Sequence, residues 1–201
     1  MSYIARRTEG RRGASLFLTF HGTGGSEEQF HGLAEQLMPG SHVVSPRGDV
    51  SEMGAARYFR RTGEGVYDMD DLAMRTRAMA DFIEEEKQRT GADRVLALGY
   101  SNGANILASV AFVRPDLVDQ LVLMHPLIPW TPEPQPGLKG RRVLVTAGER
   151  DPICPAPLTR SLAEYFDAQG AVVDLVWHPG GHEIRQDELV AIQGFVTRDP
   201  V

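Results

Sequence analysis

The sequence has a single cysteine, Cys154, and this scarcity excludes an internal disulfide and a metal site built from several cysteines. Basic residues are fewer than acidic ones: 21 Lys and Arg stand against 27 Asp and Glu, a formal net charge of −6. Nucleic-acid binders need clustered basic side chains to neutralise phosphates, so we expect no nucleic-acid partner. No apolar run approaches the ~18 residues that a membrane-spanning helix needs, so we expect no membrane span.

The first residues, 1–7, lack the apolar stretch of a secretory signal peptide, which predicts a cytoplasmic protein. At 201 residues, 42% of them hydrophobic, the chain has the size and composition of one globular domain. We therefore expect residues 1–201 to fold as a single domain with a sizeable core. Nothing in the sequence determines the oligomeric state, and a homodimer is compatible with it.

Short apolar runs alternate along the chain with segments of helical period. Most runs are apolar throughout, which is typical of strands buried on both faces of a parallel sheet. The predicted strands are residues 16–20, 43–45, 94–99, 120–124, 142–147 and 172–177. The predicted helices are residues 27–38, 70–89, 102–113, 157–168 and 186–196. This alternation predicts an α/β fold, with a mostly parallel sheet of six or seven strands and helices on both faces.

Two segments show no clear period. Residues 47–67 contain four glycines and four arginines, and residues 126–140 contain five prolines and Trp130. Both follow the carboxyl ends of predicted strands, where ligands bind in open parallel sheets, although plain surface connections are the alternative. Arg60 and Arg61 are candidate contacts for a carboxylate or phosphate on the substrate, because guanidinium pairs with such groups. A solvated or salt-bridged arginine pair is the alternative, and Trp130 is a further candidate substrate contact.

The strongest chemical signal is the run GYSNG, residues 99–103, between a predicted strand and a predicted helix. The pattern G-x-S-x-G in this setting is a nucleophile elbow, a tight turn that exposes the serine hydroxyl. Ser101 also lies at a helix N-terminus, where developing negative charge is favoured. An ordinary glycine-rich turn between strand and helix is the alternative.

A serine nucleophile needs a base and an acid that orients the base. Asp151 and His182 follow the fifth and sixth predicted strands, so both reach the same edge of the sheet as Ser101. Glu149 and His178 are the competing acid and base. Asp151 is favoured because it stands further into its loop, and His182 because the glycines before it let the backbone turn toward Ser101.

Acyl transfer also needs two backbone N–H donors for the oxyanion. The candidates are Asn102, directly after the nucleophile, and Thr23, in the glycine-rich loop after the first predicted strand. That loop lacks the lysine of a P-loop, and the sequence has no G-x-G-x-x-G pattern, so no nucleotide cofactor is indicated. His178 and His182 are separated by Pro179, which prevents a shared helix face, so we expect no metal and no cofactor.

Two further residues near this predicted site are interpreted as structural. His125 ends the fourth predicted strand, and a hydrogen-bonded structural histidine is favoured over a residue that lines the site. Cys154 follows Asp151 by three residues but lacks an elbow or helix N-terminus that would lower its pKa. We expect a small buried thiol.

These motifs resemble the bacterial carboxylesterase and phospholipase branch of the α/β-hydrolases, which includes acyl-protein thioesterases and is close to the dienelactone hydrolases. The resemblance covers nearly the whole chain. It implies a compact α/β-hydrolase without a large cap domain, in which Ser101, Asp151 and His182 form a catalytic triad and Thr23 and Asn102 are the oxyanion donors. Acyl-protein thioesterases usually carry leucine and glutamine at the two oxyanion positions, and dienelactone hydrolases use a cysteine nucleophile.

A narrower likeness lies in residues 46–48, 58–61 and 64–68, which are similar to a hydroquinone-associated subgroup of small hydrolases. The resemblance to the carboxylesterase branch implies a serine carboxylesterase that acts through an acyl-enzyme. Its substrate would be a small molecule, a small or medium ester. A thioesterase or lysophospholipase with the same triad is one alternative. A non-catalytic ligand-binding module on the same fold is an alternative of a different class.

Overall fold

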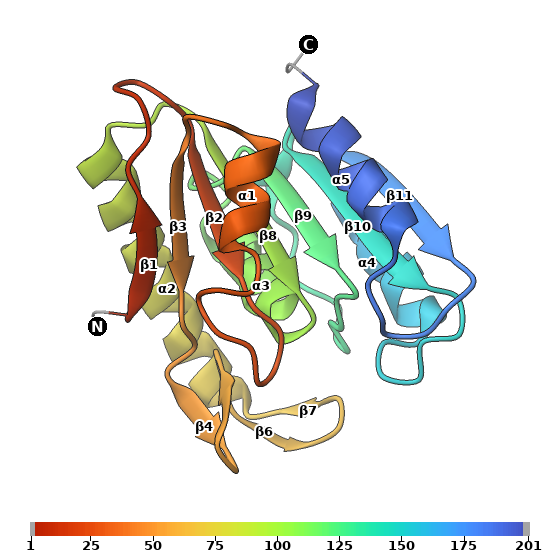
Figure 1. The fold of residues 1–201 in the computed structure, drawn as a ribbon. Helices are drawn as coiled ribbons and strands as arrows, with labels where there is room; N and C mark the ends of the chain where they lie inside the picture. The colour runs from red at the N-terminus through yellow and green to blue at the C-terminus, as the bar shows by residue number, and fades with distance from the viewer. Residues whose placement is uncertain (1–2, 199–201) are drawn as a thin grey trace.

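The computed structural model describes residues 3–198 of the chain. Its centre is a seven-stranded sheet in the order β1-β3-β2-β8-β9-β10-β11, and every neighbouring pair is parallel except β1 and β3 (Figure 1). The strands of this sheet are β1 (Ala5–Thr8), β2 (Leu16–Phe20), β3 (His42–Pro46), β8 (Val95–Tyr100), β9 (Gln120–Met124), β10 (Arg142–Gly148) and β11 (Val172–His178). The predicted α/β fold with a mostly parallel sheet is confirmed.

Helices cover both faces of the sheet. They are α1 (His31–Leu37), α2 (Met69–Thr90), α3 (Asn102–Val113), α4 (Ala156–Ala168) and α5 (Gln186–Thr197), with a short 3-10 turn at Pro136–Leu138. Helices α1 and α5 lie on one face, and α2, α3 and α4 lie on the other (Figure 1). Each of the five predicted helices is present, and α3 has the predicted bounds.

Two clusters of buried side chains fill the space between the sheet and these helices. Phe17 of β2 belongs to the cluster that contains Ile192 and Phe195 of α5. The next residue, Leu18, belongs to the cluster that contains Ile106 of α3. Successive side chains of a strand point to opposite faces of the sheet. A strand covered on both faces is therefore apolar at every position, which is the pattern seen in the sequence.

The sequence pattern missed the edge strand and the small hairpins. β1 has the sequence ARRT, and its side chains are half-buried or exposed, so it carries no apolar signal. Residues 47–67 form two hairpins, which pair β4 (Val50–Glu52) with β5 (Ala55–Arg57) and β6 (Arg61–Gly63) with β7 (Val66–Tyr67). The hairpins project beyond the carboxyl ends of the central strands (Figure 1). This places the arginine-rich segment at the edge where a ligand site is expected.

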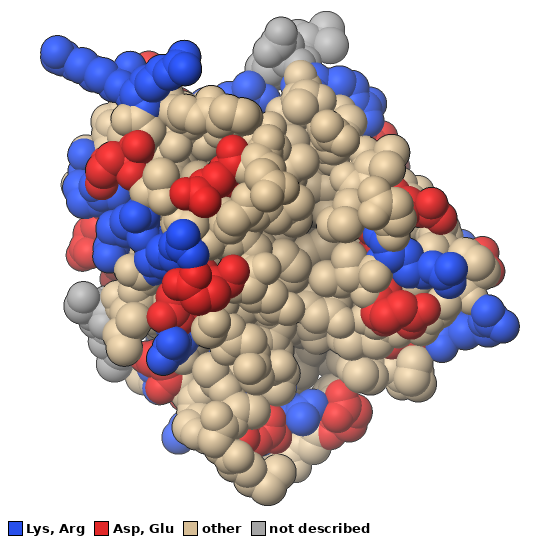
Figure 2. Space-filling model, in the orientation of Figure 1, with Lys and Arg blue, Asp and Glu red and all other residues tan. Residues whose placement is uncertain are grey.

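On the face in view in Figure 2, basic and acidic side chains lie beside one another around the rim, and no single basic patch forms there. Over the described residues, oppositely charged side chains also form ion pairs, such as Arg47–Glu27 and Arg114–Asp116. Within residues 3–198, no helix combines the length and the apolar character that crossing a membrane requires.

Candidate active site

The carboxyl ends of three strands bring the predicted chemical residues to one edge of the sheet. Ser101 follows β8, Asp151 lies in the loop after β10, and His182 lies in the loop after β11. Strands β8 to β11 are neighbours and parallel, so their carboxyl ends meet at this edge. Residues up to 81 positions apart in sequence thereby reach hydrogen-bonding distance.

Ser101 lies in a strained turn between β8 and α3. Its φ of 53° and ψ of −116° are unusual for any residue with a side chain, and its N–H donates to the carbonyl of Met124 at 2.9 Å. A Cβ at Gly99 would lie 2.5 Å from the carbonyl oxygen of Gly103, and one at Gly103 would lie 2.4 Å from that of Phe20. The turn therefore accepts only glycine at both positions, which is the steric reason for the G-x-S-x-G pattern.

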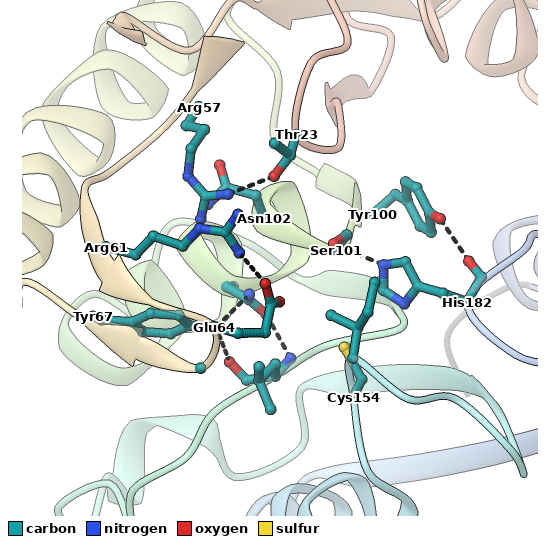
Figure 3. A pocket seen from close by; sticks show the side chains of 14 residues that line it. Thr23, Arg57, Arg61, Glu64, Tyr67, Tyr100, Ser101, Asn102, Cys154 and His182 are labelled. Atoms are coloured by element: carbon teal, nitrogen blue, oxygen red, sulfur yellow. Dashed lines mark hydrogen bonds and ion pairs between the residues drawn. The ribbon is translucent and has the colours of Figure 1, made fainter. Parts of the chain in front are cut away.

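His182 links Ser101 to Asp151. Its Nε2 lies 2.9 Å from the Ser101 hydroxyl (Figure 3), and its Nδ1 lies 2.7 Å from Oδ2 of Asp151. The Tyr100 hydroxyl donates to the main-chain carbonyl of His182 at 2.6 Å, which helps to hold the loop in place. The structure thus brings together the three residues that the sequence singled out. The competing acid, Glu149, is exposed.

The Asp151 carboxylate is buried and stays ionised. Burial alone opposes its charge, but hydrogen bonds from the Cys154 N–H, His125, His182 and the Ile153 N–H outweigh that cost and hold its pKa below the usual value. An ionised carboxylate at this position orients the His182 ring and stabilises the imidazolium that forms when the ring takes up a proton.

A second set of buried side chains lies behind Asp151. His125 contacts Asp151 through Nδ1 at 2.9 Å and Glu188 of α5 through Nε2 at 3.1 Å. His178 contacts the other Glu188 oxygen at 3.2 Å, and its side chain is fully buried, so it does not compete with His182 for Ser101. The interpretation of His125 as a hydrogen-bonded histidine that does not line the cavity agrees with the structure, which shows in addition that its ring contacts Asp151. Glu188 was missed, since on a predicted helix a lone glutamate resembles any solvated residue.

A cavity of about 290 Å³ opens beside Ser101 (Figure 3). Tyr67, Asn105 and Leu127 form one wall, in which the Tyr67 hydroxyl donates to the Leu127 carbonyl at 2.8 Å and accepts from the Asn105 amide at 2.9 Å. Cys154 also lines the cavity, but it is buried, its thiol donates to the His125 carbonyl at 3.1 Å, and burial raises its pKa. The predicted buried thiol is confirmed.

Two arginines of the hairpin segment face this cavity. Arg57 is almost fully buried and donates to the Thr23 hydroxyl at 2.7 Å. Arg61 is partly exposed and bonds to Glu64 at 2.8 Å and to Glu52 at 3.0 Å. Figure 3 shows the Arg57 guanidinium joined to Thr23 and the Arg61 guanidinium joined to Glu64. Arg57 and Glu64 were missed, and the only available signal was their place in the same arginine-rich segment.

Arg60 and Trp130 do not line this cavity. Arg60 points outward, with 61% of its side chain exposed, and forms ion pairs with Asp68 and Asp71. Trp130 packs edge-on against the ring of Tyr67, with ring centroids 6.0 Å apart, and so supports the wall of the cavity from behind. Successive side chains along an extended chain point to opposite sides, so Arg60 and Arg61 point in different directions although they are neighbours in sequence.

Thr23 and Asn102, the candidate oxyanion donors, both line the cavity beside Ser101. Asn102 is the first residue of α3, and the first N–H groups of a helix have no partner within the helix. Its side-chain oxygen accepts from the Tyr58 N–H at 2.8 Å, which ties the start of α3 to the hairpin segment. The position of both residues suits donors to a negatively charged oxygen at Ser101.

Two groups of three side chains within residues 3–198 could in principle hold a metal ion: His125, Asp151 and His182, and His125, His178 and Glu188. In the second group, Nδ1 of His178 accepts the Gly180 N–H at 3.0 Å, so the proton of the neutral ring lies on Nε2, which faces Glu188. A protonated nitrogen cannot bind a metal. These contacts fit a hydrogen-bonded cluster.

Comparison with known proteins places these features in context. The model of the dienelactone hydrolase family matches residues 53–188. The putative hydrolase MhqD of Bacillus subtilis is 39% identical over 176 residues, which make up 87% of this chain and 88% of that protein.

Two solved structures are closely similar over nearly their whole length. The protein Atu2452 of unknown function from Agrobacterium tumefaciens is 55% identical, with a TM-score of 0.92, over 96% of this chain and 95% of that chain. A Bacillus cereus carboxylesterase is 34% identical, with a TM-score of 0.90, over 96% of this chain and 92% of that chain. These likenesses confirm the resemblance that the sequence motifs indicated.

Proposed function

Because the chain belongs to the dienelactone hydrolase family, we propose that it is a serine carboxylesterase, which cleaves a small or medium ester through an acyl-enzyme on Ser101. Family membership makes the protein a hydrolase of the dienelactone hydrolase and carboxylesterase type. The observation that supports a serine-esterase mechanism is the chain of hydrogen bonds from Ser101 through His182 to the ionised Asp151.

The reaction follows from this chain of hydrogen bonds. Ser101 Oγ attacks the ester carbonyl carbon while His182 Nε2 takes the hydroxyl proton, and the N–H groups of Thr23 and Asn102 stabilise the oxyanion. His182 then gives the proton to the departing alcohol, which leaves an acyl group on Ser101. A water molecule, deprotonated by His182, attacks this acyl-enzyme, and the carboxylic acid departs as Ser101 regains its proton. Asp151 holds the ring in the tautomer that accepts at Nε2.

The size of the cavity supports a small or medium acyl group. Its volume of about 290 Å³ lies just below the usual range for small-molecule sites, roughly 300 to 1,000 Å³. A long lipid chain would extend beyond it, so a lysophospholipase is less well supported. A panel of p-nitrophenyl esters of rising chain length is expected to give its highest kcat/KM with short acyl chains.

A fluorophosphonate probe provides the direct test of the nucleophile. The probe is expected to phosphonylate the Ser101 hydroxyl, because the His182 contact at 2.9 Å makes this hydroxyl a nucleophile. Mass spectrometry of the digested protein should place the adduct in the peptide that contains Ser101. Labelling of another serine, or labelling that persists in Ser101→Ala, would contradict the proposal, and a protein inert to the probe and to every ester would instead be a ligand-binding module.

The arginines of the cavity support an ester that carries an anionic group. Arg57 and Arg61 line the cavity together with Glu64, and Glu52 pairs with both arginines at 3.4 and 3.0 Å, so the two arginines are balanced only while Glu64 stays in place. The Arg61–Glu64 pair is exposed on the Glu64 side, and such pairs contribute little stability. A carboxylate or phosphate on the substrate can therefore replace Glu64 and form a bidentate contact with Arg61.

Arg61→Gln is expected to lower kcat/KM for a carboxylate-bearing ester by about 10- to 100-fold, the equivalent of ~1.5 to 3 kcal/mol for a charge-assisted hydrogen bond. The neutral isostere of the ester should be hydrolysed at nearly the wild-type rate. Arg60→Gln is the matched control, because the neighbouring arginine points away from the cavity. Equal losses on both esters, or no preference for the charged ester in the wild type, would count against an anionic substrate.

A further inference from the structure

Two buried carboxylates, those of Asp151 and Glu188, lie behind the His182 ring as seen from Ser101 and are joined by the ring of His125. The side chains of Asp151 and Glu188 have no solvent exposure, and neither has that of His125, which contacts both. Two anions in a water-poor interior are costly unless a positive group lies between them. The hydrogen bonds around each carboxylate determine what that group is.

The four acceptor positions of Asp151 are all occupied. Oδ1 accepts the N–H groups of Ile153 at 2.8 Å and Cys154 at 2.9 Å, and Oδ2 contacts Nδ1 of His182 at 2.7 Å and Nδ1 of His125 at 2.9 Å. An ionised carboxylate offers about four lone-pair positions and no donor. Nδ1 of His125 is therefore a donor.

Glu188 is surrounded in the same way. Oε1 accepts the Thr146 hydroxyl at 2.6 Å and contacts Nε2 of His125 at 3.1 Å, while Oε2 accepts the Arg185 N–H at 2.8 Å and Nε2–H of His178 at 3.2 Å. With three other donors in place, this carboxylate also has the environment of an anion. Nε2 of His125 also lies 3.5 Å from Nε2 of His178, but each of the two atoms is closer to a Glu188 oxygen, at 3.1 and 3.2 Å. Nε2 of His125 is then a donor to Glu188 as well.

We propose that His125 is an imidazolium held between Asp151 and Glu188, and that His125 and Glu188 are positioning residues for the catalytic acid. This inference rests on the proposed function for its catalytic part. With His182 neutral, Asp151, Glu188 and His125 sum to one negative charge. When His182 takes the proton from Ser101, the buried cluster becomes neutral, so the charge of Glu188 favours the step in which the His182 cation forms.

The backbone of His125 is itself strained, with a φ of 48°. This region is unusual for a residue with a side chain and persists only where the surroundings hold it. Here the His125 N–H donates to the Thr146 carbonyl at 2.8 Å, and its carbonyl accepts the Cys154 thiol at 3.1 Å. The strain places the ring between the two carboxylates instead of continuing β9.

Two other groups near His125, the Tyr100 hydroxyl and the Cys154 thiol, stay uncharged near neutral pH. Burial raises the pKa of the Tyr100 hydroxyl to about 12 and raises the pKa of the Cys154 thiol as well. For His125, burial disfavours a charge, but Glu188 and Asp151 outweigh it and raise the pKa of the imidazole. His178 and His182 complete the cluster.

The proton count on His125 is the first test, and it needs no substrate. Histidine ring nitrogens of the ¹⁵N-labelled protein are assigned by triple-resonance NMR and followed from pH 6 to pH 8. Both ring nitrogens of His125 are expected to carry a proton at pH 7. A neutral His125 ring at pH 7, or one equivalent of bound metal in the purified protein by elemental analysis, would overturn the proposal whether or not the protein hydrolyses esters.

Glu188→Gln tests the positioning role. The amide oxygen still accepts the Arg185 N–H at the start of α5, so the change removes the charge while it keeps this cap. We expect His125 to lose one proton at pH 7 and kcat to fall by about tenfold or more, which is the size of the loss when a hydrogen-bond partner that orients a metal-bound histidine is removed. KM should change little, because Glu188 does not line the cavity.

Asp187→Asn is the matched control. It removes one negative charge from the same turn of α5, but Asp187 is exposed, so water screens the loss and both readouts should stay at wild-type values. An unchanged kcat in folded Glu188→Gln would assign Glu188 a structural role only. If that variant does not fold, the wild-type proton count on His125 still decides whether the ring is a cation.

Discussion

Ser101→Ala is expected to lower kcat for a p-nitrophenyl ester by about 10⁴- to 10⁶-fold, the range seen when a triad serine is removed. The reason is that no other hydroxyl lies at the hydrogen-bonding position of His182 Nε2 among the contacts of the described chain. The fold should persist, because alanine carries the same Cβ through the φ of 53° and adds no new clash. Steady-state hydrolysis measures the loss of kcat, and thermal unfolding of the wild type and of Ser101→Ala measures whether the fold persists.

Ser161→Ala provides the control for this change. Ser161 lies on α4, and its hydroxyl donates to the Pro157 carbonyl of the same helix at 3.0 Å, away from the cavity. Activity within about twofold of the wild type is expected for a surface substitution of this kind. Retention of a tenth of the wild-type activity in folded Ser101→Ala would contradict an acyl-enzyme on this residue.

His182→Ala is expected to reduce kcat to a similar degree, since the loss of any member of a unit that acts together costs nearly as much as the loss of all, roughly 10⁴-fold or more. Without the ring, neither the Ser101 proton nor the proton of the leaving alcohol has a carrier. Added imidazole should restore part of the rate, because the His182 side chain is 18% exposed and lies at the cavity.

His42→Gln is the matched histidine control. His42 lies at the amino end of β3, the opposite edge of the sheet from Ser101, and its ring contacts Glu9. The activity of the His42→Gln protein should stay close to that of the wild type. A folded His182→Ala protein that retains more than a hundredth of the wild-type kcat without imidazole would move the base to another residue. A rate that does not fall as the pH is lowered from 8 to 5 would also count against a histidine base.

The sheet and its helices could be predicted because burial on both faces leaves a continuous apolar signal. The run 120–124 was predicted with its observed bounds, and α3 likewise. β1 could not be predicted, because an edge strand packs little apolar surface and its ARRT sequence resembles a loop. The hairpins of residues 47–67 could not be predicted for a similar reason, because their strands are short and only partly buried.

The sequence was sufficient to predict the G-x-S-x-G turn around Ser101 and the strand ends that carry Asp151 and His182. Gly99 is required by a contact of 2.5 Å with the Gly103 carbonyl in the same turn, and Gly103 by a contact of 2.4 Å with the Phe20 carbonyl of the neighbouring strand β2. Both glycines fall within five consecutive residues, so the pattern can be recognised in the sequence although one of its causes is a tertiary contact.

Which arginines face the cavity, and which side chains contact Asp151 from behind, could be seen only in the folded structure. Arg61 and Arg60 are adjacent and chemically identical, and the hairpin alone directs one inward and the other toward solvent. His125 and Glu188 are 63 residues apart, and they meet because β9 and α5 pack around the same sheet edge. A contact of this kind depends on where two distant elements pack, so it leaves no spacing that can be recognised along the chain.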